Sequence, residues 1–125
     1  MPISYEINEA RGLVLTTASG TLTDSDNLQL KARLVADPRW KPGIRELSDV
    51  RSIDRLEVTT EGVQQMEWHD EDDAAALASY RLAIVVSQQG VYEMARIYQM
   101  LTEHTVPNVR VFRDMEEANR WLMAN

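Results

Sequence analysis

The feature that most constrains the fold is the apolar run LAIVV, Leu82 to Val86, in a segment that begins at Tyr80. Strands buried on both faces of a parallel sheet have this composition, whereas strands with one solvated face alternate apolar and polar residues. The run is far shorter than the roughly 20 apolar residues that a membrane-spanning helix requires. The sequence therefore predicts a buried strand at Tyr80–Val86 and no membrane span.

The rest of the chain alternates strand patterns with helix patterns. Extended runs at Ser4–Asn8 and Leu13–Ala18 flank Gly12, which predicts an antiparallel hairpin. Further strands are predicted at Arg45–Val50 and Val109–Phe112. Strands that alternate with helices require crossover connections, which produce a largely parallel sheet. We predict an α/β fold with a mixed, mostly parallel sheet of about five strands and about four helices, in which an antiparallel strand lies toward one edge.

Four helices are expected, three between these strands and one after the last strand. The first begins after Thr23, ends before Pro38, and is predicted to bury Leu28, Ala32 and Val35, with Leu34 beside them. The second begins at Thr59 or Thr60 and contains Val63, Met66 and Trp68. Ser87 is predicted to cap the third, in which Val91, Met94, Ala95, Tyr98 and Leu101 recur at helical spacing. The last lies within residues 114–125 and is predicted to bury Met115, Ala118 and Leu122.

Length and charge limit the possible functions. The 125 residues agree with one domain, residues 1–125, because no linker, repeat or low-complexity segment divides them. A net charge of −7 opposes attraction to nucleic acid and to anionic membranes, so no nucleic-acid partner is predicted. Cysteine is absent, which excludes a disulfide framework and a thiolate metal site. We expect a cytoplasmic protein, since the first residues do not resemble an export signal.

The hairpin and five later segments together resemble the SpoIIAA-like family of bacterial proteins, within the STAS superfamily. The segments are GTLTD, RELSDVR, EVTTEGV, VYEMARIYQML and VRVFRDMEEANRWL, and the resemblance covers nearly the whole chain. It implies the fold of the anti-sigma factor antagonists. Related folds include lipid-carrier domains, so the resemblance also implies that an apolar cavity, if present, could bind a ligand.

In the anti-sigma factor antagonists a serine at a helix start is phosphorylated, which releases a partner kinase. Here the resemblance places the strand ELS, which ends at Ser48, before a turn in which Thr59, Thr60 and Gly62 stand in place of the serine motif. Glu61 would lie beside an incoming phosphate. A hydroxyl that caps a helix contributes about 1 kcal/mol by itself, so we prefer capping to phosphorylation for both threonines.

A second candidate surface follows the buried strand. Ser87 to Gly90 should lie at the carboxyl end of a parallel strand and at a helix start, where open α/β sheets bind ligands. The turn lacks a GxGxxG pattern, so a plain helix cap is preferred. This turn and the Thr59–Gly62 turn are predicted to share one edge of the sheet.

The third helix is apolar over more than one stripe, through Tyr92, Met94, Ile97, Tyr98 and Met100. Three explanations remain open, namely full burial, a dimer contact, and the wall of an apolar cavity. Ordinary core packing is preferred because methionine commonly fills irregular gaps. Tyr92, Met94 and Tyr98 are the candidate binding residues of this helix.

The segment WHDEDD suggests a metal site, since His69 and Asp73 are one helical turn apart. With one histidine in a strongly polar stretch, a solvated acidic segment is the preferred interpretation, and neither a metal nor a cofactor is predicted. The sequence has no GxSxG elbow and no P-loop, so we predict no catalysis.

Two functions remain after these exclusions. The first is a non-catalytic STAS-type module that works through contact with a protein partner or as a homodimer. The alternative is a carrier or sensor of a small apolar ligand beneath the third helix. A filled core with an apolar surface patch would favour the first, and an internal cavity of a few hundred Å³ would favour the second.

Overall fold

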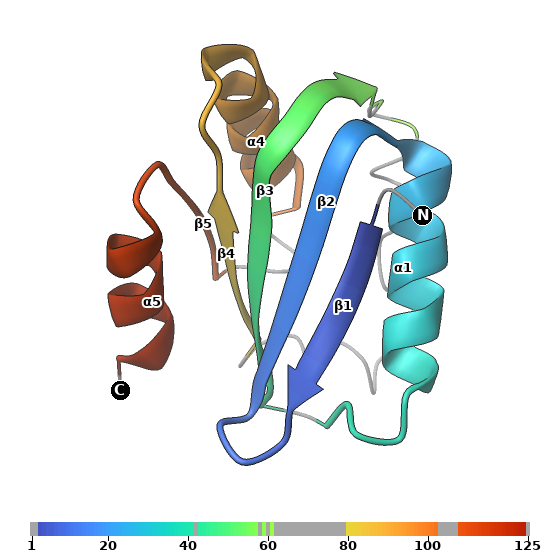
Figure 1. Ribbon diagram of the computed structural model, residues 1–125, viewed down its shortest axis with the longest axis vertical. Helices are drawn as coiled ribbons and strands as arrows, with labels where there is room; N and C mark the ends of the chain where they lie inside the picture. Colours follow the sequence, from blue (N-terminus) through green and yellow to red (C-terminus); the bar gives the residue numbers. More distant parts are fainter. Residues whose placement is uncertain are drawn as a thin grey trace.

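The strands form one five-stranded sheet in the order β1-β2-β3-β4-β5 within the part of the chain that the structure describes (Figure 1). The structure is a computed structural model that describes residues 3–41, 43–57, 59, 61, 80–102 and 108–124. β1 (Ile3–Asn8) pairs antiparallel with β2 (Leu13–Thr23). β3 (Arg45–Glu57), β4 (Arg81–Val85) and β5 (Val109–Phe112) continue the sheet in parallel. The predicted mixed, mostly parallel sheet with an antiparallel edge strand is confirmed.

The hairpin turn depends on the glycine that the sequence singled out. Gly12 has a φ of 61°, in the left-handed region that residues with a Cβ rarely adopt. Its N–H donates to the carbonyl of Glu9 across 3.3 Å, which closes the turn. Its own carbonyl accepts the N–H of Arg45, so the same residue joins the hairpin to the start of β3.

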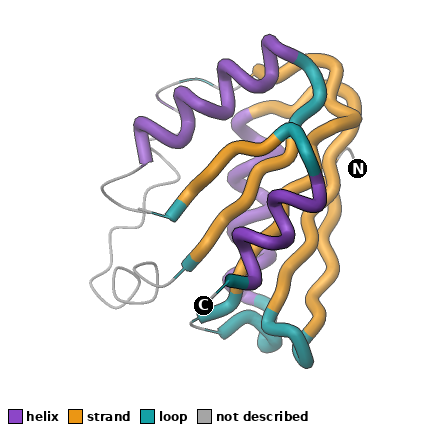
Figure 2. Tube along the Cα trace, turned by 90° about the vertical axis from the view of Figure 1, so that its left-hand side faces the viewer, coloured by secondary structure: helices purple, strands orange, loops and turns teal. Residues whose placement is uncertain are grey.

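Helices cover both faces of the sheet (Figure 2). The described residues contain three, α1 (Asp24–Ala36), α4 (Gln89–Thr102) and α5 (Met115–Met123). α1 and α4 pack on one face, where their side chains join a core with Val14, Ile44, Ile53 and Ile84. α5 packs on the other face, where Ala118 and Leu122 meet Leu13, Leu47, Ala83 and Val85. No helix in these described ranges is long and apolar enough to cross a membrane. The predicted second helix falls almost entirely outside the described residues.

Two helix starts agree with the sequence and one differs. Thr23 and Asp26 form a reciprocal capping box on α1, as the Thr23 prediction requires. Asp114 caps α5. The prediction that Ser87 caps the third helix is wrong, because α4 begins at Gln89 and the Ser87 hydroxyl instead donates to the carbonyl of Arg51 across 2.8 Å.

β2 and β3 are both longer than their sequence patterns predict. β3 continues to Glu57, whereas the sequence pattern predicts a strand that ends at Val50. The extension is stabilised by parallel pairing with residues 19–23 of β2, and Ile53 is completely buried within it. Gly20, with a φ of 70°, lies at the register shift that lets the two strands stay paired.

The buried face of α1 also differs from the prediction. Leu30 and Leu34 are buried, whereas Val35 is 38% exposed and Ala32 faces solvent. The helix carries apolar residues on two separate stripes, one with Leu30 and Leu34 and the other with Leu28, Ala32 and Val35, and the position of the sheet decides which stripe is covered. Of the residues expected inside β3, Leu47 faces α5, while Ile44 and Val50 face α1 and α4.

Candidate functional site

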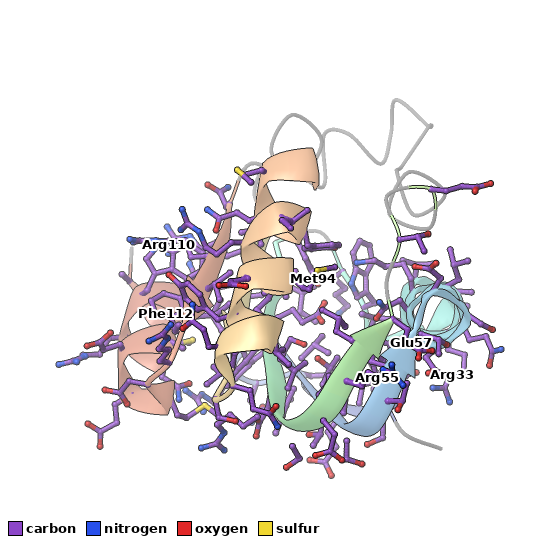
Figure 3. The ribbon with its side chains drawn as sticks, turned by 90° about the horizontal axis from the view of Figure 1, so that it is seen from above. Arg33, Arg55, Glu57, Met94, Arg110 and Phe112 are labelled. Atoms are coloured by element: carbon purple, nitrogen blue, oxygen red, sulfur yellow. The ribbon has the colours of Figure 1, made fainter. Side chains whose placement is uncertain are left out.

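A pocket of about 100 Å³ lies between α1 and α4, above the face of the sheet that these helices cover. Its walls are mainly aliphatic side chains, including Leu30 and Leu34 from α1, Val91 and Ala95 from α4, and Ile53 and Ile84 from the sheet. Figure 3 shows Met94 projecting from α4 toward α1, while Arg110 and Phe112 lie on the other side of α4, near α5. The pocket is therefore a gap in the larger core, with walls from two helices and a floor of strands.

One wall of the pocket carries a buried carboxylate. Glu46 on β3 is only 5% exposed, and both of its oxygens accept hydrogen bonds from hydroxyl groups. Thr16 on β2 donates to Oε2 across 3.2 Å, and the phenol of Tyr80 donates to Oε1. A buried carboxylate needs such donors because the loss of hydration would otherwise destabilise it. Burial, followed by the nearby Glu46, raises the pKa of Tyr80 well above its ordinary value, so this phenol keeps the proton that it donates.

Lys31 brings a positive charge to the same pocket. It lies on α1 and lines the pocket, and its Nζ is 5.7 Å from the centroid of the Tyr80 ring. Both charges act on Tyr98 of α4. Burial raises the pKa of its phenol, Lys31 lowers that pKa, and Glu46 raises it. The pocket thus combines apolar walls with one acidic and one basic side chain.

Three of the candidate residues from the sequence lie together in this pocket. Met94 and Tyr98 line it from α4, and Ser48 lines it from β3, two residues after Glu46 on the same face of the strand. Ser48 was chosen because of its place in the ELS strand, whereas in the structure it is a polar part of an apolar pocket. The role of each remains a prediction.

Thr59 lies elsewhere, beyond the end of β3. Its backbone N–H donates to Asp24 Oδ1 across 3.0 Å and its hydroxyl donates to Asp24 Oδ2 across 2.7 Å. This contact joins the end of β3 to the first residue of α1. Thr60 and Gly62, the other candidates of that turn, fall outside the described residues.

Ser87 and Gly90 lie at the carboxyl end of β4, but their surroundings are those of a structural turn. The Ser87 hydroxyl donates to the carbonyl of Arg51, and the side-chain amide of the next residue, Gln88, donates to the carbonyl of Ile53 across 3.1 Å. A Cβ added to Gly90 would meet open space, so packing does not require a glycine there. The turn is braced against the middle of β3, whereas Thr59 lies past the end of that strand.

Tyr92 is separate from the pocket as well. Its ring packs half-buried against the larger core, and the guanidinium of Arg113 lies 4.3 Å from the ring centroid. Arg113 also donates to the side-chain oxygen of Gln89. These contacts connect the first turn of α4 to the end of β5.

No group of three or more His, Asp or Glu side chains able to hold a metal ion occurs among the described residues. His69 and Asp73, which raised that possibility in the sequence, lie outside them.

Sequence reasoning missed Glu46 and Lys31 as pocket residues. Glu46 could have been detected, because it lies an even number of residues from Ile44 and Val50 and therefore points to the same face of the strand. Both of those residues are buried. A charged residue among inward-facing apolar positions indicates a buried polar group with dedicated partners. Lys31 had no such signal, since lysine on an amphipathic helix is ordinarily solvated.

The sheet order and its two-sided helix cover define a class, the α/β proteins with a mixed, mostly parallel sheet. Within that class, the chain has a SpoIIAA-like fold. It is similar to the crystal structure of an uncharacterized protein from the DUF3478 family with a SpoIIAA-like fold, from Shewanella loihica PV-4. The two share 20% sequence identity over 96% of this chain and 93% of that one, with a TM-score of 0.58. No protein-family model matches the sequence, and comparison with curated proteins gives no match.

Proposed function

We propose that this protein is a non-catalytic carrier or sensor that binds a small, mainly apolar molecule in the pocket between α1 and α4. The observation that carries the proposal is the pocket itself, which is lined by aliphatic side chains and interrupted by a few polar groups. Small-molecule sites commonly have this composition, with polar groups that fix the orientation of the ligand. The SpoIIAA-like fold supports a binding role, since proteins of that fold are generally not catalysts.

The volume limits the ligand to a small molecule. A cavity of about 150 Å³ in another protein accommodates benzene, so a pocket of about 100 Å³ has room for a smaller group. It is smaller than the few hundred Å³ that the sequence-based criterion requires for a carrier of an apolar ligand, so it has no room for a whole long-chain lipid. We therefore propose a short apolar ligand, or the short end of a longer one.

Native mass spectrometry of freshly purified protein, followed by thermal-shift measurements with short-chain compounds, tests this function. A matched pair of variants makes the test specific to the pocket. Ala95→Leu extends a side chain that lines the pocket, and Ala32→Leu makes the same change on the exposed face of α1. We expect Ala95→Leu to abolish binding and Ala32→Leu to preserve it. Equal binding by both variants would contradict the assignment of the pocket.

Protein contact, the function first expected from the sequence, is the second candidate. Ile97 and Met100 on α4 favour it, because they are 41% and 59% exposed and lie one helical turn apart. The same native mass spectra report the assembly mass. A complex that persists in the double variant Ile97→Ser/Met100→Ser would rule out a role for these two side chains.

A further inference from the structure

We propose that the pocket recognises a neutral hydroxyl group and therefore selects a small apolar alcohol over the carboxylate or ammonium compound of the same chain length. The inference rests on the proposed function and specifies the chemical class of its ligand. Glu46 would accept the hydrogen bond of the ligand hydroxyl, and Lys31 would donate one to its oxygen.

The acceptor is Glu46, which lies in the wall of the pocket and is almost fully buried. A carboxylate offers about four lone-pair positions. Thr16 and Tyr80 use two of them, one on each oxygen. Neither donor is among the residues that line the pocket, so the two hold the carboxylate in place while leaving capacity for a further donor from the pocket.

The sign of the charges distinguishes the three ligand classes. A carboxylate ligand would place a second negative charge near Glu46, where the low dielectric of the core strengthens repulsion. An ammonium ligand would meet the positive charge of Lys31. Lys31 lowers and Glu46 raises the pKa of Tyr98, so both charges act on the same part of the pocket. An ion bound there is repelled by one charge while the other attracts it, and the hydration that it loses on burial then has no compensation. A hydroxyl group adds no charge, and it can both donate and accept.

The test is a comparison of butan-1-ol, butanoate and butylammonium, each titrated into the full ¹⁵N-labelled chain and followed by the amide resonances of Leu30, Ser48 and Ala95. We expect butan-1-ol to bind at least about tenfold more tightly than either ion, equivalent to about 1.4 kcal/mol. If either ion binds as tightly as the alcohol, the inference is overturned while the proposed function stands. If none of the three shifts the pocket resonances, the proposed function itself fails.

Two variants locate the origin of the selectivity. Glu46→Gln removes the negative charge and should reduce the discrimination against butanoate to less than about threefold. Lys31→Met removes the positive charge and should weaken the discrimination against butylammonium. Glu6→Gln makes the same change as Glu46→Gln on an exposed residue of β1 and should leave all three affinities unchanged. Undiminished selectivity in Glu46→Gln would overturn the inference. If that variant does not fold, undiminished selectivity in Lys31→Met would overturn it.

Discussion

The hydroxyl of Thr59 donates a hydrogen bond to the carboxylate of Asp24 across 2.7 Å, and the backbone N–H of the same residue donates to the other carboxylate oxygen across 3.0 Å. The two residues are 35 positions apart in sequence. The contact fixes the end of β3 against the first turn of α1. A phosphate on Thr59 would replace this attraction with repulsion between two negative groups.

The first prediction concerns this contact. Thr59→Val removes the hydroxyl at nearly constant shape, and we expect the free energy of unfolding to fall by about 1 kcal/mol, since the bond is charge-assisted but exposed. Urea denaturation followed by circular dichroism measures the change. Thr21→Val, at an exposed position of β2, is the control. Equal stability of the two variants would show that the hydroxyl bond to Asp24 contributes nothing.

The second prediction concerns stability at high pH. Because burial and Glu46 raise the pKa of Tyr80 well above 10, the folded protein keeps this proton to a higher pH than the unfolded chain does. The resulting stabilisation is complete below about pH 10 and decreases as the pH rises further. We expect Tyr80→Phe to lose less stability than the wild type between about pH 9 and pH 11.

Denaturant unfolding across this pH range measures that difference. Tyr92→Phe, which alters a half-buried phenol outside the pocket, is the matched control and should keep the slope of the wild type. At neutral pH, Tyr80→Phe should also lower the free energy of unfolding by about 1–3 kcal/mol, because Glu46 loses a buried donor. An unchanged alkaline slope in Tyr80→Phe would contradict the prediction.

The third prediction concerns stability in acid. Asp37 accepts hydrogen bonds from the side chain and the backbone of Arg39, which hold its pKa well below the usual range. A depressed pKa stabilises the folded state above about pH 4, and that stabilisation disappears as the pH falls. We expect Asp37→Asn to be less stable than the wild type at neutral pH and to show a weaker loss of stability in acid.

Thermal unfolding between about pH 2 and pH 6 checks this expectation. Arg39→Gln should flatten the acid limb in the same direction, since it removes the main cause of the pKa shift. Asp54→Asn, an exposed carboxylate on β3, is the control. An acid limb as steep in Asp37→Asn as in Asp54→Asn would disprove the assignment.

The fourth prediction concerns the attachment of α5. Arg81 donates to the carbonyls of Trp121 and Ala124, and Arg45 donates to that of Leu122 across 2.7 Å, so two strands hold the carboxyl end of the helix. We expect Arg81→Gln to speed hydrogen exchange in α5 by about tenfold while leaving α1 unchanged, as loss of a charge-assisted bond would do. Arg120→Gln, on the exposed face of α5, should change neither helix.

The succession of strands and helices along the chain and the cap at Thr23 were predictable because they depend on local patterns. The length of β3 was not. Residues 51–57 are rich in charge and resemble a connection, and only their pairing with the distant end of β2 makes them a strand. The covered stripe of α1 was equally undetermined, since Leu30 and Val35 lie on separate faces of the helix and the sheet covers one of them.

The candidate site was predictable in part for a similar reason. The inward position of Met94 and Tyr98 could be predicted from the helical spacing of apolar residues in α4, which is visible in the sequence. The pairing of Glu46 with Tyr80 does not, because it joins two strands across 34 residues. Only the even spacing of Glu46 from Ile44 and Val50 could have indicated that this carboxylate points inward.

The contacts of Ser87 and Gln88 have a consequence for the behaviour of this protein in solution. Asp49 is the last residue of β3 that pairs with β4, through Val85, and beyond it one edge of the long strand β3 is no longer bordered by that neighbour. Uncovered strand edges attract strands of other molecules and so promote aggregation. By binding the carbonyls of Arg51 and Ile53, these two turn side chains occupy acceptors that an intruding chain would need, and thereby help to keep each molecule from recruiting the next.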